Sequence, residues 1–180
     1  MTVDGSVRSD LIAAIPSLRA FAMSLTGHRD RADDLVQETI TRAWANIHKF
    51  EPGTNMNAWL FTILRNLFHS DYRKRKHEVE DADGSYAARL RTQPDQQGHL
   101  DFEDFRTALV TLPLDQQEAL LLVGAHGMSY EEAAEVCQVP VGTIKSRVNR
   151  ARTRLAALLD LTSEAELGPD DVTKAALTAG

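Results

Sequence analysis

Residues 129–155 read SYEEAAEVCQVPVGTIKSRVNRARTRL and predict a short acidic helix, a tight turn and a longer basic helix. Ser129 followed three residues later by Glu132 is a capping-box pattern, in which the hydroxyl and the carboxylate satisfy amide donors at a helix start. The first helix should end near Cys137, because Pro140 lacks an N–H and its ring clashes with the preceding turn. Proline suits the beginning of a helix, so the second helix should start close to Pro140.

The second predicted helix has distinct faces. Apolar side chains recur at helical spacing on one side, at Ile144, Val148, Ala151 and Leu155. Ser146, Asn149, Arg150 and Thr153 lie opposite, and cations flank them at Lys145, Arg147, Arg152 and Arg154. This pattern predicts a helix-turn-helix whose second helix enters the DNA major groove, with cations at phosphates and polar tips at base edges. The alternative is a solvated helix that is merely basic.

Charge is unevenly distributed along the 180 residues, whose net charge is −6. Residues 65–76 carry five cations and one acid, and residues 141–155 carry five cations and no acid. Residues 77–104 carry eight acids and two cations, and residues 160–180 carry five acids and one lysine. The chain is therefore an acidic protein with two basic surfaces, a distribution compatible with nucleic-acid binding.

The composition favours helices in a reducing compartment. Hydrophobic residues make up 43% of the chain and aromatic residues only 6%, with Ala, Leu, Arg, Glu and Asp abundant. Cys137 is the single cysteine, which excludes an internal disulfide and suits the cytoplasm. We expect Cys137 to be a small apolar residue at the helix-turn-helix corner, with a redox role as the less favoured alternative. Neither a membrane span nor a signal peptide is expected, since no apolar run is long enough and residues 1–8 are polar.

Two amphipathic helices are predicted at the start of the chain. Residues 9–26 should form the first, kinked or restarted at Pro16 and ended by Gly27. Residues 29–48 should form the second, with a wide apolar stripe that includes Trp44.

A third helix should start near Asn55 or Asn57 and run to about Lys76. Its end carries four consecutive cations at residues 73–76, more than a favourable interaction with the helix dipole requires. With Tyr72 beside them, these cations resemble a surface that tracks phosphates and stacks unpaired bases.

The next segment, residues 77–100, shows no helical period and holds a run of acids. It predicts an acidic flexible linker, because it is too long and polar for an ordinary loop within one domain. Beyond it, residues 101–111 should form a short amphipathic helix. Residues 116–125 should form another, capped by Asp115 together with Glu118.

The predicted fold is therefore all-α, with two small helical domains at residues 9–76 and 101–160. The acidic linker at residues 77–100 joins them, and an acidic tail follows at residues 161–180, with a short helix at residues 171–177. No duplicated block appears along the chain, so this is not a repeat protein.

A series of short motifs runs through both predicted domains. They are DDLVQET at residues 33–39, RAW at 42–44, NAWLFTI at 57–63, RN at 65–66, LP at 112–113, EEAA at 131–134 and GTIKSR at 142–147. Together they resemble the extracytoplasmic-function class of bacterial sigma factors, over residues 10–76 and 102–159. The overall texture is similar to the EcfG-like subgroup, which runs the general stress response of alphaproteobacteria. The resemblance implies a sigma-2 domain followed by a sigma-4 domain that contains the helix-turn-helix.

The resemblance also implies three groups of binding residues. Those implied to dock on core RNA polymerase are Asp33, Asp34, Gln37, Glu38 and Arg42. Those implied to bind the −10 promoter element, where a flipped base exposes its Watson–Crick edge, are Asn55, Asn57, Trp59, Arg65, Tyr72, Arg73, Lys74 and Lys76. Those implied to read the −35 element as duplex are Thr143, Lys145, Ser146, Arg147, Asn149, Arg150 and Arg154. The alternatives are a solvated face for Asp33 and Glu38, a helix cap for Asn55 or Asn57, and core packing for Trp59.

The implied partners are core RNA polymerase, at its clamp coiled coil and its flap, promoter DNA and an anti-sigma factor. In the stress-response subgroup the anti-sigma factor is small, helical and NepR-like, and a response regulator carrying a sigma-like domain competes for it. The linker would pass near the RNA exit path, where its acids mimic nucleic acid or simply keep the chain in solution. No membrane partner is expected.

Other classes of protein fit the sequence less well. A sigma-like decoy that sequesters an anti-sigma factor would carry a receiver domain, and no such α/β stretch is present, while the cations at residues 73–76 and 145–154 are retained. A stand-alone helix-turn-helix regulator leaves residues 29–76 unexplained. An enzyme is least favoured, because the chain has no phosphate-binding glycine loop and its six histidines lack ligand spacing. We therefore expect no catalytic residue, no cofactor and no metal.

Overall fold

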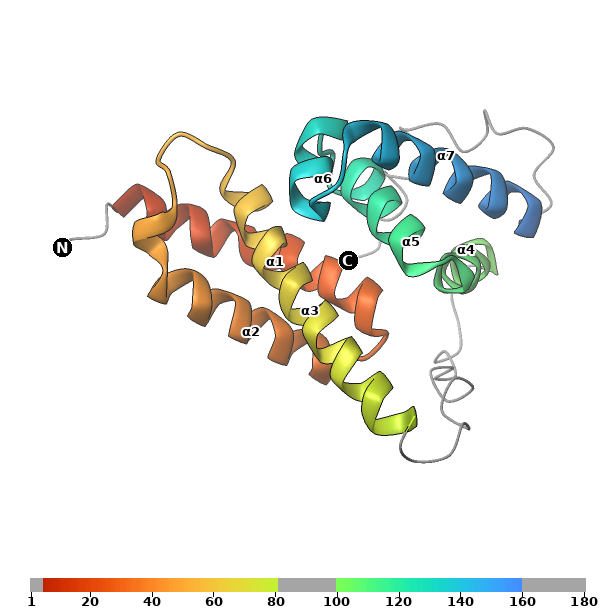
Figure 1. The fold of residues 1–180 in the computed structure, drawn as a ribbon, viewed down its shortest axis with the longest axis horizontal. Helices are drawn as coiled ribbons and strands as arrows, with labels where there is room; N and C mark the ends of the chain where they lie inside the picture. The colour runs from red at the N-terminus through yellow and green to blue at the C-terminus, as the bar shows by residue number, and fades with distance from the viewer. Residues whose placement is uncertain (1–4, 81–99, 160–180) are drawn as a thin grey trace. The chain divides into compact units, whose positions relative to one another are not determined.

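The computed structural model describes residues 5–80 and 100–159, with side chains described for residues 5–76 and 104–159. The chain divides into two compact units, Met1–Gln93 and Pro94–Gly180. Every regular element in the described part is helical, which confirms the all-α prediction (Figure 1). The first unit holds α1 (Gly5–Thr26), α2 (Arg29–Ala45), the 3₁₀ turn η1 (Ile47–Lys49) and α3 (Met56–Glu80). The second holds α4 (Leu100–Thr111), α5 (Leu114–Leu120), the π-helical turn η3 (Leu121–Ala125), α6 (Tyr130–Cys137) and α7 (Val141–Leu158).

The first unit is a bundle in which α1, α2 and α3 pack against one another. Leu18 and Phe21 of α1 and Leu60, Phe61 and Leu64 of α3 are all buried in the core of this unit. The rings of Phe21 and Phe61 lie edge to face with their centroids 4.9 Å apart, an arrangement that aromatic pairs prefer. Burial of these large side chains is the main stabilising contribution to the unit.

Helix α1 is longer and less interrupted than the sequence predicts. It begins at Gly5 and runs through Pro16 without a restart. Pro16 is exposed, so water can satisfy a carbonyl that loses its partner on that side of the helix. The helix ends as predicted at Gly27, whose φ is +67° and whose N–H donates to the Met23 carbonyl oxygen at 2.9 Å.

The apolar stripe of α2 is narrower than predicted. Ala32, Val36 and Ala43 are buried, and Thr39 joins them because its hydroxyl donates to the Leu35 carbonyl oxygen at 2.7 Å. Trp44 is 48% exposed. It follows Ala43 by one residue, which turns it about 100° away from the buried line.

The second unit is organised around α7, which packs against α4, α5 and α6. Its largest fully buried side chains include Leu122, Val136, Ile144, Val148 and Leu155. Three of these lie on α7 at the positions that helical spacing predicts. The apolar face of the basic helix is therefore the center of this unit's core.

The start of α5 differs from the prediction. The helix begins at Leu114, with Pro113 before it, and no side chain caps it. The predicted capping pattern of Asp115 and Glu118 is therefore wrong. Asp115 lies in the first turn, where a carboxylate is favoured by the helix dipole, and Glu118 is turned into the unit and is fully buried.

The helix predicted at residues 116–125 changes to π geometry after Leu120. The N–H of His126 donates to the Leu121 carbonyl oxygen, five residues back, at 3.0 Å. Gly127, with φ of +64°, then closes the helix as expected. Burial lowers the pKa of His126 from 6.5 to about 4, because the charged imidazolium is poorly solvated there.

Two predicted segments fall mostly outside the described residues. Residues 77–80 continue α3 beyond its predicted end, and Leu100 begins α4. The rest of the predicted linker, the tail at residues 161–180 and its short helix lie outside the described part of the chain.

Candidate nucleic-acid and polymerase interfaces

The helix-turn-helix predicted at residues 129–155 is present. The Ser129 Oγ accepts from the Glu132 N–H at 3.0 Å, and the Glu132 carboxylate accepts from the Ser129 N–H at 2.9 Å, which completes the capping box. Helix α6 ends at Cys137, which is buried at the corner as predicted. Gln138 then takes a left-handed conformation, with φ of +57°, and Pro140 leads into α7.

Helix α7 presents the predicted polar face to solvent. Ile144, Val148, Ala151 and Leu155 are buried, and Ser146, Asn149, Arg150 and Thr153 are exposed. Thr143, another predicted DNA contact, is half-buried in the first turn, where its N–H donates to the Pro140 carbonyl oxygen at 2.9 Å. The exposed face combines short polar groups with a cation, the combination that base edges in a major groove accept.

Two of the exposed hydroxyls are partly committed within α7 itself. The Ser146 Oγ donates to the Gly142 carbonyl oxygen at 3.0 Å, and the Thr153 Oγ1 donates to the Asn149 carbonyl oxygen at 3.1 Å. Each hydroxyl therefore keeps its lone pairs for accepting a hydrogen bond, but its proton is occupied. The side chains of Asn149 and Arg150 carry no such commitment in the described part of the chain. They are the groups on this face best able to donate to a base.

Three of the flanking cations are held by neighbouring helices. Arg147 Nε lies 3.1 Å from Asp115 Oδ2, and Arg154 Nη1 donates to Gln116 Oε1 at 3.2 Å, both on α5. Lys145 Nζ lies 5.8 Å from the center of the Tyr130 ring on α6. The sequence predicts the cations but not these partners, because Asp115, Gln116 and Tyr130 belong to other helices.

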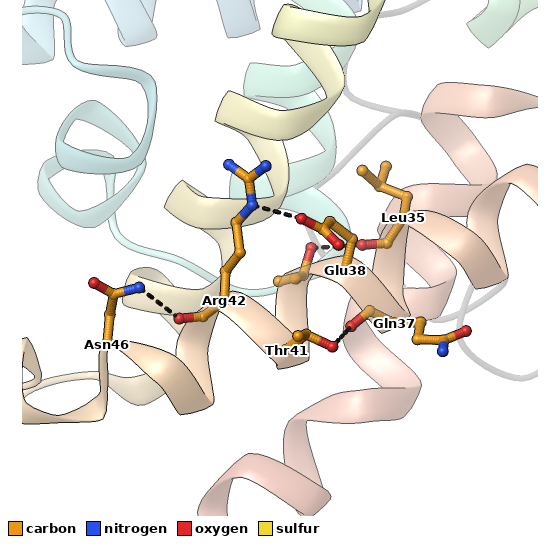
Figure 2. A network of polar contacts seen from close by, with 7 residues as sticks. Leu35, Gln37, Glu38, Thr41, Arg42 and Asn46 are labelled. Carbon is orange, nitrogen blue, oxygen red and sulfur yellow. Dashed lines mark hydrogen bonds and ion pairs between the residues drawn. The ribbon is translucent and has the colours of Figure 1, made fainter.

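The residues predicted to dock on polymerase lie along α2. Asp34, Gln37, Glu38 and Arg42 are exposed, and Figure 2 shows Arg42 reaching back to Glu38, with Nε 2.7 Å from Oε1. In the same view, the Thr41 hydroxyl donates to the Gln37 carbonyl oxygen at 2.8 Å, and Asn46 Nδ2 donates to the Arg42 carbonyl oxygen at 2.9 Å. Such exposed pairs add little stability, so this face is not explained by the needs of the fold.

Asp33 is placed differently from the other four. Its Oδ1 lies 2.7 Å from Arg19 Nε on α1. The pair links the first two helices of the bundle across their exposed edge. This contact differs from the solvated face given as the alternative for Asp33, and it could not be assigned from the sequence because Arg19 belongs to another helix.

The residues predicted near the start of α3 have separate surroundings. Asn55 Oδ1 accepts from the Ala58 N–H at 3.2 Å, so Asn55 caps α3. Asn57 is exposed in the first turn. Trp59 is half-buried, with its ring 5.3 Å from the Phe50 ring, which supports the packing alternative for this tryptophan.

The basic end of α3 is a surface with one aromatic ring. Tyr72 is 48% exposed, and its ring stacks on Phe68 with centroids 6.2 Å apart. Arg73, Lys74 and Lys76 are exposed, whereas Arg65 is half-buried. Arg75 lies between the exposed Lys74 and Lys76 in sequence and is itself half-buried, with its Nη2 3.0 Å from Asp71 Oδ2. The arrangement offers a stacking ring and cations for phosphates on one helix end.

The described residues hold no cluster of three or more His, Cys, Asp or Glu side chains that could bind a metal ion. Within the same residues, no helix is both long enough and apolar enough to cross a membrane.

Comparison with known proteins gives consistent matches. A family model described as Sigma-70 region 2 matches residues 11–78, and one described as Sigma-70, region 4 matches residues 102–155. The chain is 64% identical over 177 residues, 98% of both proteins, to the ECF RNA polymerase sigma factor EcfG of Rhodopseudomonas palustris (strain TIE-1). It is 39% identical over 144 residues to the ECF RNA polymerase sigma factor SigC of Mycobacterium tuberculosis (strain CDC 1551 / Oshkosh), covering 79% of this chain and 73% of that relative. The sigma factor RpoE of Bartonella quintana, solved in complex with the anti-sigma factor NepR, matches with a TM-score of 0.78 and 51% identity over 87% of this chain and 98% of that one.

Proposed function

This chain belongs to the extracytoplasmic-function sigma factors of bacterial RNA polymerase, in the EcfG-like group, and we propose on that premise which of its surfaces bind polymerase, the −10 element and the −35 element. It binds core RNA polymerase and directs initiation at specific promoters. The observation that carries the proposed division is the exposed, acid-free face of α7, which follows the capped helix α6 and a tight turn. That face reads the −35 element, and the first unit serves polymerase and the −10 element.

Reading of the −35 duplex falls mainly to Asn149 and Arg150, whose donors are uncommitted in the described structure. Ser146 and Thr143 contribute acceptors, and Lys145 contributes charge near the phosphates. A bidentate arginine or asparagine contact discriminates against a wrong base by about 1–3 kcal/mol. Two such contacts suffice for half of a promoter, since the other half is read elsewhere in the same complex.

The exposed face of α2 docks on the clamp coiled coil of core polymerase through Asp34, Gln37, Glu38 and Arg42. The Glu38–Arg42 pair is exposed, so both side chains can exchange this weak contact for contacts with polymerase. Asp33 acts chiefly through Arg19, by fixing α2 against α1. The second unit binds the flap of core polymerase.

The opened −10 element is held by the first unit. Asn57, exposed beside the capping residue Asn55, lies where an unpaired base can be read along its Watson–Crick edge. Tyr72 stacks on a neighbouring base, and Arg73, Lys74 and Lys76 hold the backbone. Arg65 and Trp59 support this surface from half-buried positions.

The residue limits proposed for these tasks are 9–76 for the −10 and polymerase domain and 101–160 for the −35 domain. The acidic linker predicted at residues 77–100 lies between them, apart from residues 77–80, which continue α3, and Leu100, which begins α4. Residues 161–180 are the proposed acidic tail. A small helical anti-sigma factor of the NepR kind holds the protein inactive until a stress signal releases it, as the complex of the Bartonella quintana sigma factor suggests. The protein works in the cytoplasm, where its polymerase is.

Transcription with purified core polymerase tests this proposal. A promoter is selected from a randomised library with the wild-type protein and polymerase, and initiation is then measured with and without the protein. Specific initiation supports a sigma factor. Binding to a NepR-like protein without any initiation supports the decoy, and specific duplex binding that does not need polymerase supports a stand-alone regulator.

Matched variants test the division of labour within the same assay. Arg150→Ala should weaken promoter binding at the −35 element and leave the affinity for core polymerase unchanged. Lys49→Ala removes an exposed cation from η1 and should change neither. Loss of polymerase binding in Arg150→Ala would contradict the assignment of α7 to DNA alone.

A further inference from the structure

The cations of α7 face in three different directions. Arg147 and Arg154 are seven residues apart, about two helical turns, so they project from the same flank. That flank faces α5, which packs against α7. Lys145 lies beside α6, and Arg150 faces solvent. The cations of this helix therefore cannot all perform the same task.

Arg147 is the cation most deeply engaged with its own unit. Its side chain is only 20% exposed, its Nε lies 3.1 Å from Asp115 Oδ2, and its Nη1 is buried. Within the described part of the chain that Nη1 meets no hydrogen-bond acceptor. If this guanidinium turned outward to a phosphate, the ion pair would break and the Asp115 carboxylate would lose this partner.

A carboxylate at this place is unexpected in a unit that binds DNA. An exposed acid near the duplex repels phosphates, so Asp115 taken alone should weaken binding. Asp115 and its neighbour Gln116 nevertheless occupy the first turn of α5, where each meets one arginine of the same flank of α7. The two contacts lie about two turns apart on α7 and together resist its rotation about its own axis.

Small rotations of α7 matter for base reading. With side chains the radius of a helix is about 5–6 Å, so a roll of about 20° moves the side-chain tips by about 2 Å. Hydrogen bonds to base edges tolerate only a few tenths of an ångström. The buried face of α7 includes the small residue Ala151, whose methyl group makes fewer packing contacts with the core than a larger side chain would.

We propose that Arg147 is a positioning residue, which the Asp115 carboxylate holds so that α7 aims Asn149 and Arg150 at the −35 bases. Arg147 then contacts neither base nor phosphate in the promoter complex. The inference rests on the proposed reading of the −35 duplex by α7. It assigns to Asp115, an acid, a role in strengthening DNA binding.

The test uses the full chain with core RNA polymerase and a fluorescent promoter fragment selected with the wild-type holoenzyme. Promoter Kd is measured against salt concentration and against single-base changes in the −35 element. Asp115→Asn should weaken binding about tenfold although it removes a negative charge, and should reduce the discrimination between −35 bases. Arg147→Gln should do the same, and the double variant should be no weaker than the worse single variant, because both changes break one contact.

Salt dependence separates positioning from phosphate contact. Each lost phosphate contact lowers the slope of log K against log salt by about 0.9. The slope should stay unchanged in Asp115→Asn and Arg147→Gln. Asp115→Glu, which keeps the carboxylate, should recover most of the affinity. A merely stabilising role would change the midpoint of unfolding without changing the discrimination between bases.

Two results would overturn the inference. One is an Asp115→Asn holoenzyme that binds the promoter as tightly as wild type or more tightly. The other is an Arg147→Gln holoenzyme whose salt slope falls by about 0.9, as for a lost phosphate contact. Asp115 is half exposed, so its substitution by the isosteric Asn leaves the fold intact. The Asp115→Asn result can therefore be interpreted without the Arg147→Gln result. A wild-type protein that gives no specific initiation would refute the proposed function as a whole, which is a different outcome.

Discussion

Acidification should destabilise the second unit through His126. This residue follows the π-helical turn, and its backbone N–H is bonded to the Leu121 carbonyl oxygen. Burial lowers the pKa of the imidazole from 6.5 to about 4, so the folded protein keeps it neutral at pH values where the unfolded chain protonates it. The resulting stability is complete above pH 6.5 and is lost as the pH falls toward 4.

The size of the effect follows from the two pKa values. Between them the unfolded state binds more protons than the folded state, so the free energy of unfolding falls with decreasing pH. Integrating the difference in bound protons gives a loss of about 2 kcal/mol between pH 7 and pH 5. That is a large part of the stability of a small helical unit.

Urea unfolding of the full chain, followed by circular dichroism at pH 7, 6 and 5, measures this loss. His126→Gln should be less sensitive than wild type by about 2 kcal/mol over that range. His48→Gln, which removes an exposed histidine from η1, should match wild type. The reasoning is refuted if His126→Gln and wild type lose equal stability, or if the His126 ring proton titrates near pH 6.5 in nuclear magnetic resonance spectra.

Further changes test the turn, the core and the basic end of α3. Ser129→Ala removes one half of the capping box and should destabilise the second unit by about 1 kcal/mol in urea unfolding. Gln138→Gly relieves the left-handed conformation at the turn and should stabilise the unit by about 0.5–1 kcal/mol, and a loss of stability would show that the side chain matters there. Ile144→Ala empties a fully buried position and should cost about 2–5 kcal/mol, measured by the same unfolding. Lys74→Gln should lower the salt slope of promoter binding by about 0.7 if this lysine holds a phosphate of the opened strand, and an unchanged slope would remove it from the DNA surface.

The helices and the turn were predictable because their causes are local. The capping box joins residues three positions apart, Gly27 needs only its own φ, and the apolar face of α7 follows from helical spacing. The errors in the fold concern helix boundaries, where the local sequence signal was too weak to set the start or end of the helix. Pro16 does not end α1, and α5 begins at Leu114 instead of after Asp115.

The candidate site was predictable as a set of residue types but not as a set of roles. Trp59 packs beside Phe50, and Asn55 caps the helix that follows it. Asp33 is drawn to Arg19 of another helix, while Glu38 stays on the exposed face of its own. For Asp33 and Trp59 the partner lies in another element, whereas Asn55 and Glu38 interact with residues three and four positions away.

The sequence by itself determined that residues 129–155 form a capped helix, a turn and a basic helix, and that the basic helix buries one face. These features depend on contacts within about one helical turn along the chain. Helical spacing also placed Arg150 on the exposed face, but only the tertiary structure decided that Arg147, three residues earlier on the same helix, meets Asp115. The reason is physical: the position of α5 beside α7 sets where a carboxylate lies, and no local pattern within α7 contains that position.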